Sequence, residues 1–529
     1  RAEQCTATTP DPAMIACLDD QLIARDELVR LLATGDREAV LGAARAAGRL
    51  PAPASCRSTQ PSAEARELKR ELLAERATLP LHSDDDDLPR LERRLARAES
   101  IGDAATIADA RGLLGAAQAL RGHWEQAMPT LEAAYFESYA IGDDASACDS
   151  ASDLALGASW QGHHEEALRW ARLARASAMD PTQKAEVAAV EGQMLAALGR
   201  IDEAEQALAT GLADDAPAYA RVSALTMLAT IRSSTGHPEL AEAPLHEAIA
   251  AIEGDTGDTH PDLSRPLNVL GIVQMQQGHV REARATFERA RDLLVAQLGG
   301  HHPMIAFVLG NLALAQGDLG DREGAYDSLA QVVAIFERDE AGDPARLAQA
   351  LHNLAKQALV LQRFADARRF AERSLRIDRE LRDDAEIIVS LAYLARGLRG
   401  DGDPEGAMRA WDELIALRLA TVPGDHDALG WAELEAAITA VDAGWRERAE
   451  PHIAQAIAHY AASDQTSAIE RARAERIAAR VRPHDAHKHL ERARTLLYDE
   501  ADPGDARRPT ALLELFVTSS DVADRSPDR

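Results

Sequence analysis

Histidines and carboxylates are the side chains in this sequence best suited to metal chemistry, and the histidines form one clear cluster. His484, His487 and His489 lie close together near the C-terminus, and a helix would place His484 and His487 on one face. The sequence does not specify the geometry of a carboxylate that would complete a metal site there. His163 and His164 fall at a turn between expected helices and are interpreted as polar turn residues. We therefore expect neither a metal site nor a cofactor.

Four consecutive aspartates, Asp84 to Asp87, are a second candidate for cation binding. A calcium loop needs alternating ligands, a central glycine and a terminal glutamate, and this run lacks that spacing. We expect Asp87 to cap the following helix, with Pro89 in its first turn. The rest of the run is predicted to be a solvated loop.

Motifs of known catalytic mechanisms are missing from the sequence. It has no H-E-x-x-H, G-x-S-x-G or G-x-x-x-x-G-K-[ST] motif, and no G-x-G-x-x-G after a strand pattern. The glycine-rich phosphate loop, H-R-D and D-F-G motifs of protein kinases are also missing. We predict no catalytic residues, and we expect that this chain is not an enzyme by itself.

Composition favours helices and excludes several classes of partner. The 529 residues exceed the size at which one compact core keeps growing, so several domains or an extended array are expected. Alanine and leucine dominate, which favours helix over strand. The formal net charge of −29 argues against nucleic acid and against an anionic membrane surface. No run of about 18 apolar residues exists, so no membrane span is predicted.

Cysteine usage leaves the redox state open. Cys5, Cys17 and Cys56 lie in the first part of the chain, and Cys148 lies further on. No C-x-x-C pair indicates a zinc ribbon. One disulfide near the N-terminus and buried thiols are both compatible with the sequence. Because the chain starts with Arg1, we expect further sequence before it, so a cytoplasmic and an extracytoplasmic location both stay open.

A periodic pattern of small residues begins near residue 88 and is the main structural signal. A turn glycine recurs about every forty residues, an alanine follows it by five residues, and another small residue precedes that alanine by twelve. The glycines are Gly122, Gly162, Gly199, Gly236, Gly278, Gly320, Gly402 and Gly444, and Gln362 takes the place of the glycine in a ninth unit. Two helices of a hairpin approach closely where both carry small side chains, and the glycine permits the turn between them. The pattern predicts stacked helical hairpins.

The motifs within these units resemble a known repeat family. His260-Pro261-Asp262 followed by LNVLG and GHVREA, and His302-Pro303 followed by LGNLA and GDREGA, are similar to the kinesin-light-chain variant of the tetratricopeptide repeat. Gln362 and Glu191, which stands where leucine is expected, depart from this pattern. The resemblance implies an all-α, right-handed solenoid of about nine hairpins with an N-terminal helical cap.

The expected organisation has five segments. Residues 1–60 form a helical hairpin with cysteines, and 61–98 a linker helix and partial repeat. Residues 99–462 form the tetratricopeptide repeat array, 463–518 irregular capping helices, and 519–529 a disordered tail. The segment before the repeats resembles the corresponding region of large bacterial serine/threonine protein kinases, in which a kinase domain comes first.

The first helix of each hairpin would line a concave groove, and residues one turn away from its packing positions would point into that groove. Asparagine there can hydrogen-bond both the N–H and the C=O of an extended peptide. Lys356, Arg396 and Arg399 would form a basic cluster suited to carboxylates, unless these positions are simply solvated or paired within the solenoid. The predicted groove residues are Trp160, Asn268, Met275, Gln276, Asn311, His352, Asn353, Lys356, Arg396 and Arg399; Ile272, Phe307 and Leu314 belong to the same face.

These features predict a protein-interaction module that binds a peptide or partner protein in the groove. The basic cluster predicts that this partner carries acidic or carboxylate groups. The resemblance to kinase-associated segments implies the sensor or docking region of a bacterial signalling kinase. Two alternatives are a free-standing regulator that binds a small effector or peptide, and the accessory region of another enzyme.

Overall fold

The computed structural model describes Val29 and residues 62–78, 87–121, 123–179, 181–209, 211–212, 218–338, 344–502 and 504–524. The expected hairpin at residues 1–60 and its three cysteines lie outside these ranges, apart from Val29. The chain divides into two compact units, Arg1–Asp321 with Ala334–Asp343, and Arg322–Val333 with Pro344–Arg529. Each unit is described by itself. Among the described residues, no helix is both long enough and apolar enough to cross a membrane.

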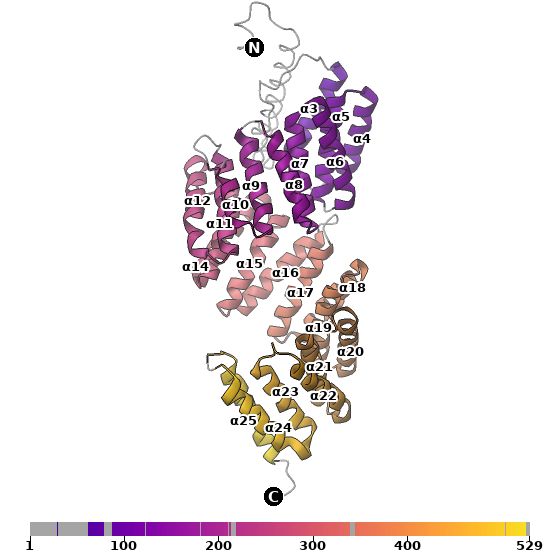
Figure 1. Ribbon diagram of the computed structural model, residues 1–529, viewed down its shortest axis with the longest axis vertical. Coiled ribbons are helices and arrows are strands. Elements are labelled where there is room, and N and C mark those ends of the chain that lie inside the picture. Colours follow the sequence, from indigo (N-terminus) through magenta and orange to yellow (C-terminus); the bar gives the residue numbers. More distant parts are fainter. Residues whose placement is uncertain are drawn as a thin grey trace, which may run out of the picture. The chain divides into compact units, whose positions relative to one another are not determined.

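The first unit is built from antiparallel helices that follow one another side by side (Figure 1). The bounds are α3 (Ala63–Thr78), α4 (Asp87–Ile101), α5 (Ala104–Leu120), α6 (Trp124–Ile141), α7 (Asp144–Trp160), α8 (His164–Ser177), α9 (Pro181–Ala197), α10 (Ile201–Leu208), α11 (Ala218–Ser234), η3 (Pro238–Leu240), α12 (Glu242–Thr256), η4 (Pro261–Leu263), α13 (Ser264–Gln276), α14 (Val280–Leu298) and α15 (Pro303–Asp318). Helix α16 (Arg322–Arg338) crosses the boundary between the units.

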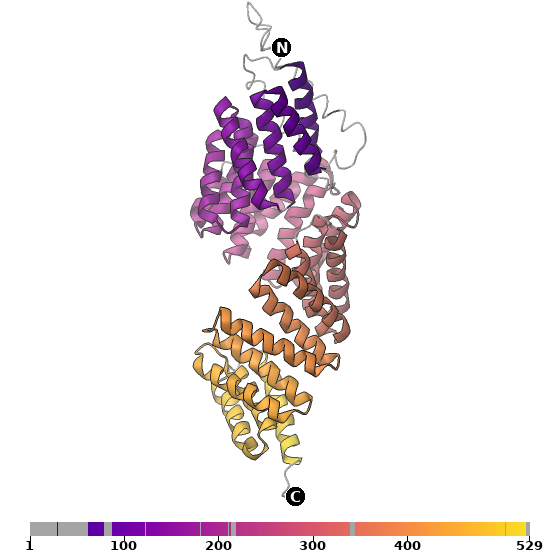
Figure 2. The same cartoon turned by 90° about the vertical axis from the view of Figure 1, so that its right-hand side faces the viewer.

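The second unit continues the same arrangement and ends in less regular helices. The bounds are α17 (Pro344–Val360), α18 (Phe364–Leu381), α19 (Asp384–Gly400), α20 (Pro404–Thr421), α21 (His426–Asp442), α22 (Arg446–Ala462), α23 (Ala468–Val481), η5 (Pro483–Asp485), α24 (Ala486–Thr495), the π-helical turn η6 (Leu496–Glu500) and α25 (Arg508–Asp524). The three C-terminal α-helices pack side by side (yellow in Figure 2). Because α25 continues to Asp524, the prediction of a disordered tail from residue 519 is wrong for the start of that segment.

The nine predicted units correspond to nine consecutive helix pairs, α5–α6 through α21–α22, among the described residues. We call the first member of each pair helix A and the second helix B. The turn between α13 and α14 shows the common geometry: Gly278 has φ 80°, and the His279 amide donates to the Gln274 carbonyl at 2.8 Å. This bond satisfies a carbonyl at the end of helix A, as a left-handed C-cap does generally.

Gln362 adopts the conformation predicted from its place in the pattern. Its φ is 57°, and the next amide, of Arg363, donates to the Ala358 carbonyl at 2.8 Å. The left-handed region costs a residue with a side chain about 1–2 kcal/mol relative to the right-handed region. A glycine would avoid this cost but would lose more entropy on folding.

Replacing Gln362 with glycine is therefore expected to raise the free energy of unfolding by about 0.5–1 kcal/mol. Chemical denaturation of the purified chain measures this difference. Arg376→Gly, at an exposed position inside α18, is the matched control and should lower stability by about 1 kcal/mol, because its backbone is helical. Equal losses from both changes would contradict the account of Gln362.

Close contact between small and large residues holds the two helices of a pair together. In α13, a Cβ added to Gly271 would lie 2.4 Å from the ring of Phe287 in α14. Gly115 in α5 faces Leu131 in α6 in the same way, at 2.7 Å. Phe287 and Leu131 are completely buried. Each stands four residues after the alanine that follows the turn glycine of its unit, a position that faces the first helix. The glycines are therefore structural, because they make room for these side chains.

Glu191, where the repeat pattern predicts leucine, is buried in α9. Its carboxylate lies 2.8 Å from Arg175 Nη1 and 3.5 Å from Arg172 Nε, both on α8. A buried charge needs a partner of opposite sign, and the neighbouring helix supplies two. The departure from the pattern is thus compensated locally.

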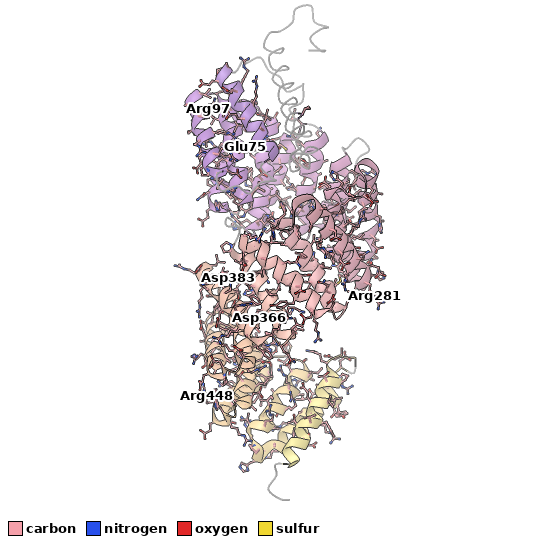
Figure 3. The ribbon with its side chains drawn as sticks, turned by 180° about the vertical axis from the view of Figure 1, so that it is seen from behind. Glu75, Arg97, Arg281, Asp366, Asp383 and Arg448 are labelled. Atoms are coloured by element: carbon pink, nitrogen blue, oxygen red, sulfur yellow. The ribbon has the colours of Figure 1, made fainter. Side chains whose placement is uncertain are left out.

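Ion pairs and hydrogen bonds of charged side chains link successive helices, and Figure 3 labels two of these side chains, Glu75 and Asp366. In α3 and α4, Glu75 accepts from Arg90 Nε at 2.7 Å. Asp87, the first residue of α4, is buried and accepts from Arg121 Nη2 at 2.7 Å. In the second unit, Asp366 of α18 accepts from the Tyr326 hydroxyl of α16 at 3.3 Å. Many of the acidic residues are therefore used in structural ion pairs.

Candidate partner-binding surfaces

The predicted groove residues of the first unit lie on helices A. Trp160 is the last residue of α7 and is 66% exposed. Asn268, Met275 and Gln276 lie on α13, and Asn311 lies on α15. Helices α13 and α15 are neighbours in the stack. The structure thus places four of these five residues on two adjacent helices.

Asn268 and Asn311 bond to each other. The Asn311 amide donates through Nδ2 to Oδ1 of Asn268 at 2.9 Å. This bond uses one donor and one acceptor, and leaves the Nδ2 donors of Asn268 and the Oδ1 acceptor of Asn311 without another bond to the described residues. The pair therefore offers one donor group and one acceptor group, the two functions that an extended peptide backbone requires.

Exposed apolar side chains flank this asparagine pair on α15. Phe307 is 53% exposed and Leu314 is 64% exposed. They stand seven residues apart with Asn311 between them, so all three share one helical face. Ile272 and Met275 of α13 are partly exposed. We call this set, Asn268, Ile272, Met275, Phe307, Asn311 and Leu314, the α13–α15 surface.

Gln276 is engaged within the protein. Its Oε1 accepts from the Ser233 hydroxyl of α11 at 2.6 Å, so this amide links two successive helices A. Such a bond fixes the side chain and occupies its oxygen. The structure therefore gives Gln276 a role in packing between repeats, and its role in partner binding stays a prediction.

In the second unit, Asn353 and Lys356 of α17 and Arg396 of α19 are exposed. Lys356 and Arg396 each directly follow the small residue of their helix A, Ala355 or Ala395, so they occupy equivalent positions on adjacent helices. Neither cation has a carboxylate partner among the described residues. We call these two side chains the α17–α19 cation pair.

Arg399, the third member of the predicted basic cluster, is already paired. Its Nη1 lies 3.1 Å from Glu435 Oε2 of α21, and Arg473 of α23 lies 2.7 Å from the other oxygen. Glu435 is buried. The Arg399–Glu435–Arg473 group therefore connects α19, α21 and α23, and the prediction that all three cations form an open cluster is wrong for Arg399.

The prediction that His352 faces the groove is also wrong, because its side chain is 2% exposed. His352 comes one residue before Asn353, and neighbouring residues of a helix point about 100° apart. That rotation moves the imidazole from solvent into the space between α17, α18 and α19. The register of the repeat did not by itself show that position 352 is buried and position 353 is exposed.

His352 belongs to a buried polar network that the repeat pattern did not predict. Its Nε2 lies 3.1 Å from Asp378 Oδ2 of α18 and 2.8 Å from Ser390 Oγ of α19. The Ser390 hydroxyl donates to the same Asp378 oxygen at 2.7 Å and lies 2.6 Å from the Ser374 hydroxyl. All four side chains are buried. Polar residues on the otherwise apolar faces of α18 and α19 were the feature of the sequence that could have indicated this network.

This serine and histidine group differs from a hydrolytic triad in its burial. In such a triad the carboxylate orients one ring nitrogen and the serine contacts the other. Glu386 Oε2 lies 3.2 Å from His352 Nδ1 and Ser390 contacts Nε2, but Ser390 is completely buried and its hydroxyl donates to Asp378. The group links three helices and has no open position for a substrate.

The C-terminal histidines lie in different environments. His489 is buried in α24, where its Nδ1 lies 2.5 Å from Glu475 Oε2 of α23. His484 lies in the short turn η5. Among the described residues, no group of three or more histidine, cysteine, aspartate or glutamate side chains is arranged to hold a metal ion.

Comparison with known proteins gives one family match and several similar folds. The tetratricopeptide repeat family matches residues 262–338. A tetratricopeptide repeat protein from Parabacteroides merdae is 17% identical, with a TM-score of 0.41 over 56% of this chain and 99% of that chain. Nearly identical repeats from a putative kinesin light chain of Podosopora anserina are 22% identical, with a TM-score of 0.35 over 39% and 97%. No curated protein sequence matches the chain.

A third similar structure is a signal transduction ATPase with a tetratricopeptide repeat sensor from Pyrococcus horikoshii, 15% identical over 74% of this chain and 54% of that chain, with a TM-score of 0.45. These low identities concern the fold alone. The family match covers α13 to α16, where the His-Pro motifs and the small-residue pattern are most regular. The chain is an all-helical solenoid of tetratricopeptide-type helix pairs, and kinesin-light-chain repeats are among the proteins with similar folds.

Proposed function

We propose that this chain is a non-catalytic interaction module that binds an extended peptide segment of a partner protein on the α13–α15 surface. The observation that carries the proposal is the asparagine pair between two exposed apolar side chains. The asparagines offer hydrogen bonds to the peptide backbone, and Phe307 and Leu314 offer apolar contact to alternate peptide side chains.

We propose the α17–α19 cation pair as a second, separate contact surface, which lies in the second unit and suits acidic groups. Lys356 and Arg396 are exposed and equivalent in register, and a carboxylate group could contact either side chain. Because the whole chain has a net charge of −29, a strongly acidic partner is repelled at long range. An acidic segment would therefore depend on these two local cations.

We further propose that the module serves as the sensor or docking region of a bacterial signalling serine/threonine kinase. The resemblance of the N-terminal segment to kinase-associated regions supports this assignment. The runner-up is a free-standing regulator that binds a small effector or peptide, followed by the accessory region of another enzyme. The residues encoded directly before Arg1 test the assignment: kinase motifs there support it, and a different catalytic domain contradicts it.

Charged substitutions on the two surfaces test peptide binding. Peptides selected from a random display library on the immobilised chain would be labelled, and their affinity measured by fluorescence anisotropy. Leu314→Asp is expected to weaken binding at least about tenfold, because it places a charge in the apolar contact. Combined Lys356→Glu and Arg396→Glu changes are expected to weaken the binding of acidic peptides and to leave the binding of neutral peptides unchanged.

Helix B provides the matched controls. Val295→Asp changes an exposed apolar residue of α14, and Arg409→Glu changes an exposed arginine of α20, so each repeats the chemistry away from helices A. Both controls should leave peptide affinity unchanged. A peptide that tolerates Leu314→Asp but is lost with Val295→Asp would place binding on helix B and overturn the proposal.

A further inference from the structure

A pocket of about 440 Å³ lies in the second unit between α22, α23, α24 and the π-helical turn η6. Pockets for small molecules in proteins have volumes of about 300–1,000 Å³. The pocket is built from the C-terminal helices and is separate from the α13–α15 surface and from the α17–α19 cation pair, so it is independent of the function proposed above.

The pocket exists because the helical stack becomes irregular here. Helix α24 ends after ten residues, and the chain continues as the π-helical turn Leu496–Glu500. A π-helical turn is wider than an α-helical turn and is frequent at functional sites. Leu496 and Glu500, the two ends of this turn, both line the pocket. The π-helical geometry therefore contributes directly to the shape of the cavity wall.

Apolar side chains form one part of the wall. Ile457 and Ala461 of α22, Ala474 of α23 and Leu496 of the π-helical turn line the cavity. The ring of Tyr460 is buried beside them. Burial raises the pKa of the Tyr460 hydroxyl, so this residue is neutral at physiological pH. This part of the wall suits a small aliphatic group.

Charges of both signs form the other part. Arg471 of α23 lies 2.9 Å from Glu500, and Arg492 of α24 lies 3.8 Å from the largely buried carboxylate of Glu475. Arg492 is 64% exposed and makes no closer ion pair among the described residues. Glu491 is a third carboxylate in the lining. Guanidinium and carboxylate groups thus stand on one small cavity, next to its apolar wall.

We propose that this pocket binds a small zwitterion with an aliphatic side chain, such as a free amino acid. The carboxylate of the ligand pairs with Arg492, its ammonium group pairs with the glutamates of α24 and the π-helical turn, and its side chain packs against Ile457, Ala474 and Leu496. A ligand with one charge would contact pocket charges of one sign only, and a neutral ligand would form no ion pair with the pocket.

Four forms of one compound test the charge requirement. L-leucine, L-leucinamide, N-acetyl-L-leucine and N-acetyl-L-leucinamide share a side chain and differ in which end is charged. Ligand-observed NMR with the whole chain should show the strongest binding for L-leucine and at least a tenfold weaker affinity for N-acetyl-L-leucinamide. Equal affinity for the four forms, or no binding of L-leucine at millimolar concentration, would overturn the proposal.

Two variant pairs locate the binding. Ala461→Phe fills the pocket from an exposed position and should abolish binding, whereas Ala462→Phe, at the next exposed position of α22, should not. Arg492→Ala should weaken the binding of L-leucine at least tenfold. Lys488 is an exposed cation of the same helix outside the pocket, and Lys488→Ala should leave the affinity unchanged. Binding that survives Ala461→Phe would show that the amino acid binds elsewhere.

Discussion

Replacing Asp378 with alanine is expected to destabilise the second unit by about 3–5 kcal/mol, the loss typical for breaking a buried pair. The carboxylate is the shared acceptor for His352 and Ser390, and all three side chains are buried. Without it, the imidazole and the hydroxyl each lose one of their partners in a buried site, because among the described residues His352 keeps only Glu386 and Ser390, and Ser390 keeps only His352 and Ser374. Hydrogen exchange of the amides in α17, α18 and α19, measured by mass spectrometry, should become faster in all three helices.

Glu380→Ala is the matched control for this experiment. Glu380 lies on the same helix, is exposed, and its replacement is expected to change stability by less than about 0.5 kcal/mol. A triple change to apolar residues, His352→Leu with Asp378→Leu and Ser390→Ala, should recover much of the stability lost in Asp378→Ala. If Asp378→Ala were as mild as the control, the network would contribute nothing to holding the three helices together.

Gly271→Ala is expected to destabilise the first unit although alanine is the better helix former. The added methyl group would lie 2.4 Å from the buried ring of Phe287, so the ring or the helix must move. Overpacking of this kind costs about 1–3 kcal/mol, which exceeds the gain of about 1 kcal/mol from helix propensity. Thermal and chemical denaturation should both show the loss.

The same substitution at Gly310 should have the opposite sign. Gly310 lies inside α15, and nothing lies within 4 Å of a Cβ added there, so Gly310→Ala keeps the propensity gain of up to about 1 kcal/mol. Combining Gly271→Ala with Phe287→Leu should restore part of the lost stability, because α11–α12 carries alanine and leucine, Ala229 and Leu245, at the same two register positions and buries both. Equal effects at Gly271 and Gly310 would contradict close packing as the reason for glycine at position 271.

The α13–α15 surface explains why the sequence identifies a class of function without identifying a partner. The small residues of helix A are fixed by contact with helix B, as Gly271 is by Phe287. Their neighbours, the partly exposed Ile272 and the exposed Leu314, contribute less to that contact and can change with the ligand. The chemistry of the partner is therefore encoded in side chains that the repeat pattern leaves unspecified.

The sequence by itself determined the helix pairs and their turns, because these depend on short-range spacing. A small residue, a turn and a second small residue within one hairpin specify a close helix contact wherever they recur. The pattern was strong enough to assign Gln362 to a left-handed turn position, where the structure has φ 57°. Phe287, Leu131 and Trp411, each four residues after the alanine of its unit, are completely buried.

Only the tertiary structure decided which polar residues face a partner and which are used internally. Asn268 pairs with Asn311, Arg399 pairs with Glu435, and His352 contacts Ser390, across separations of 36 to 43 residues. Each choice depends on how two successive repeats are rotated and on a turn of about 100° between neighbouring residues of one helix. Repeat spacing specifies contacts within a hairpin, whereas side-chain pairing between hairpins depends on their packing in three dimensions.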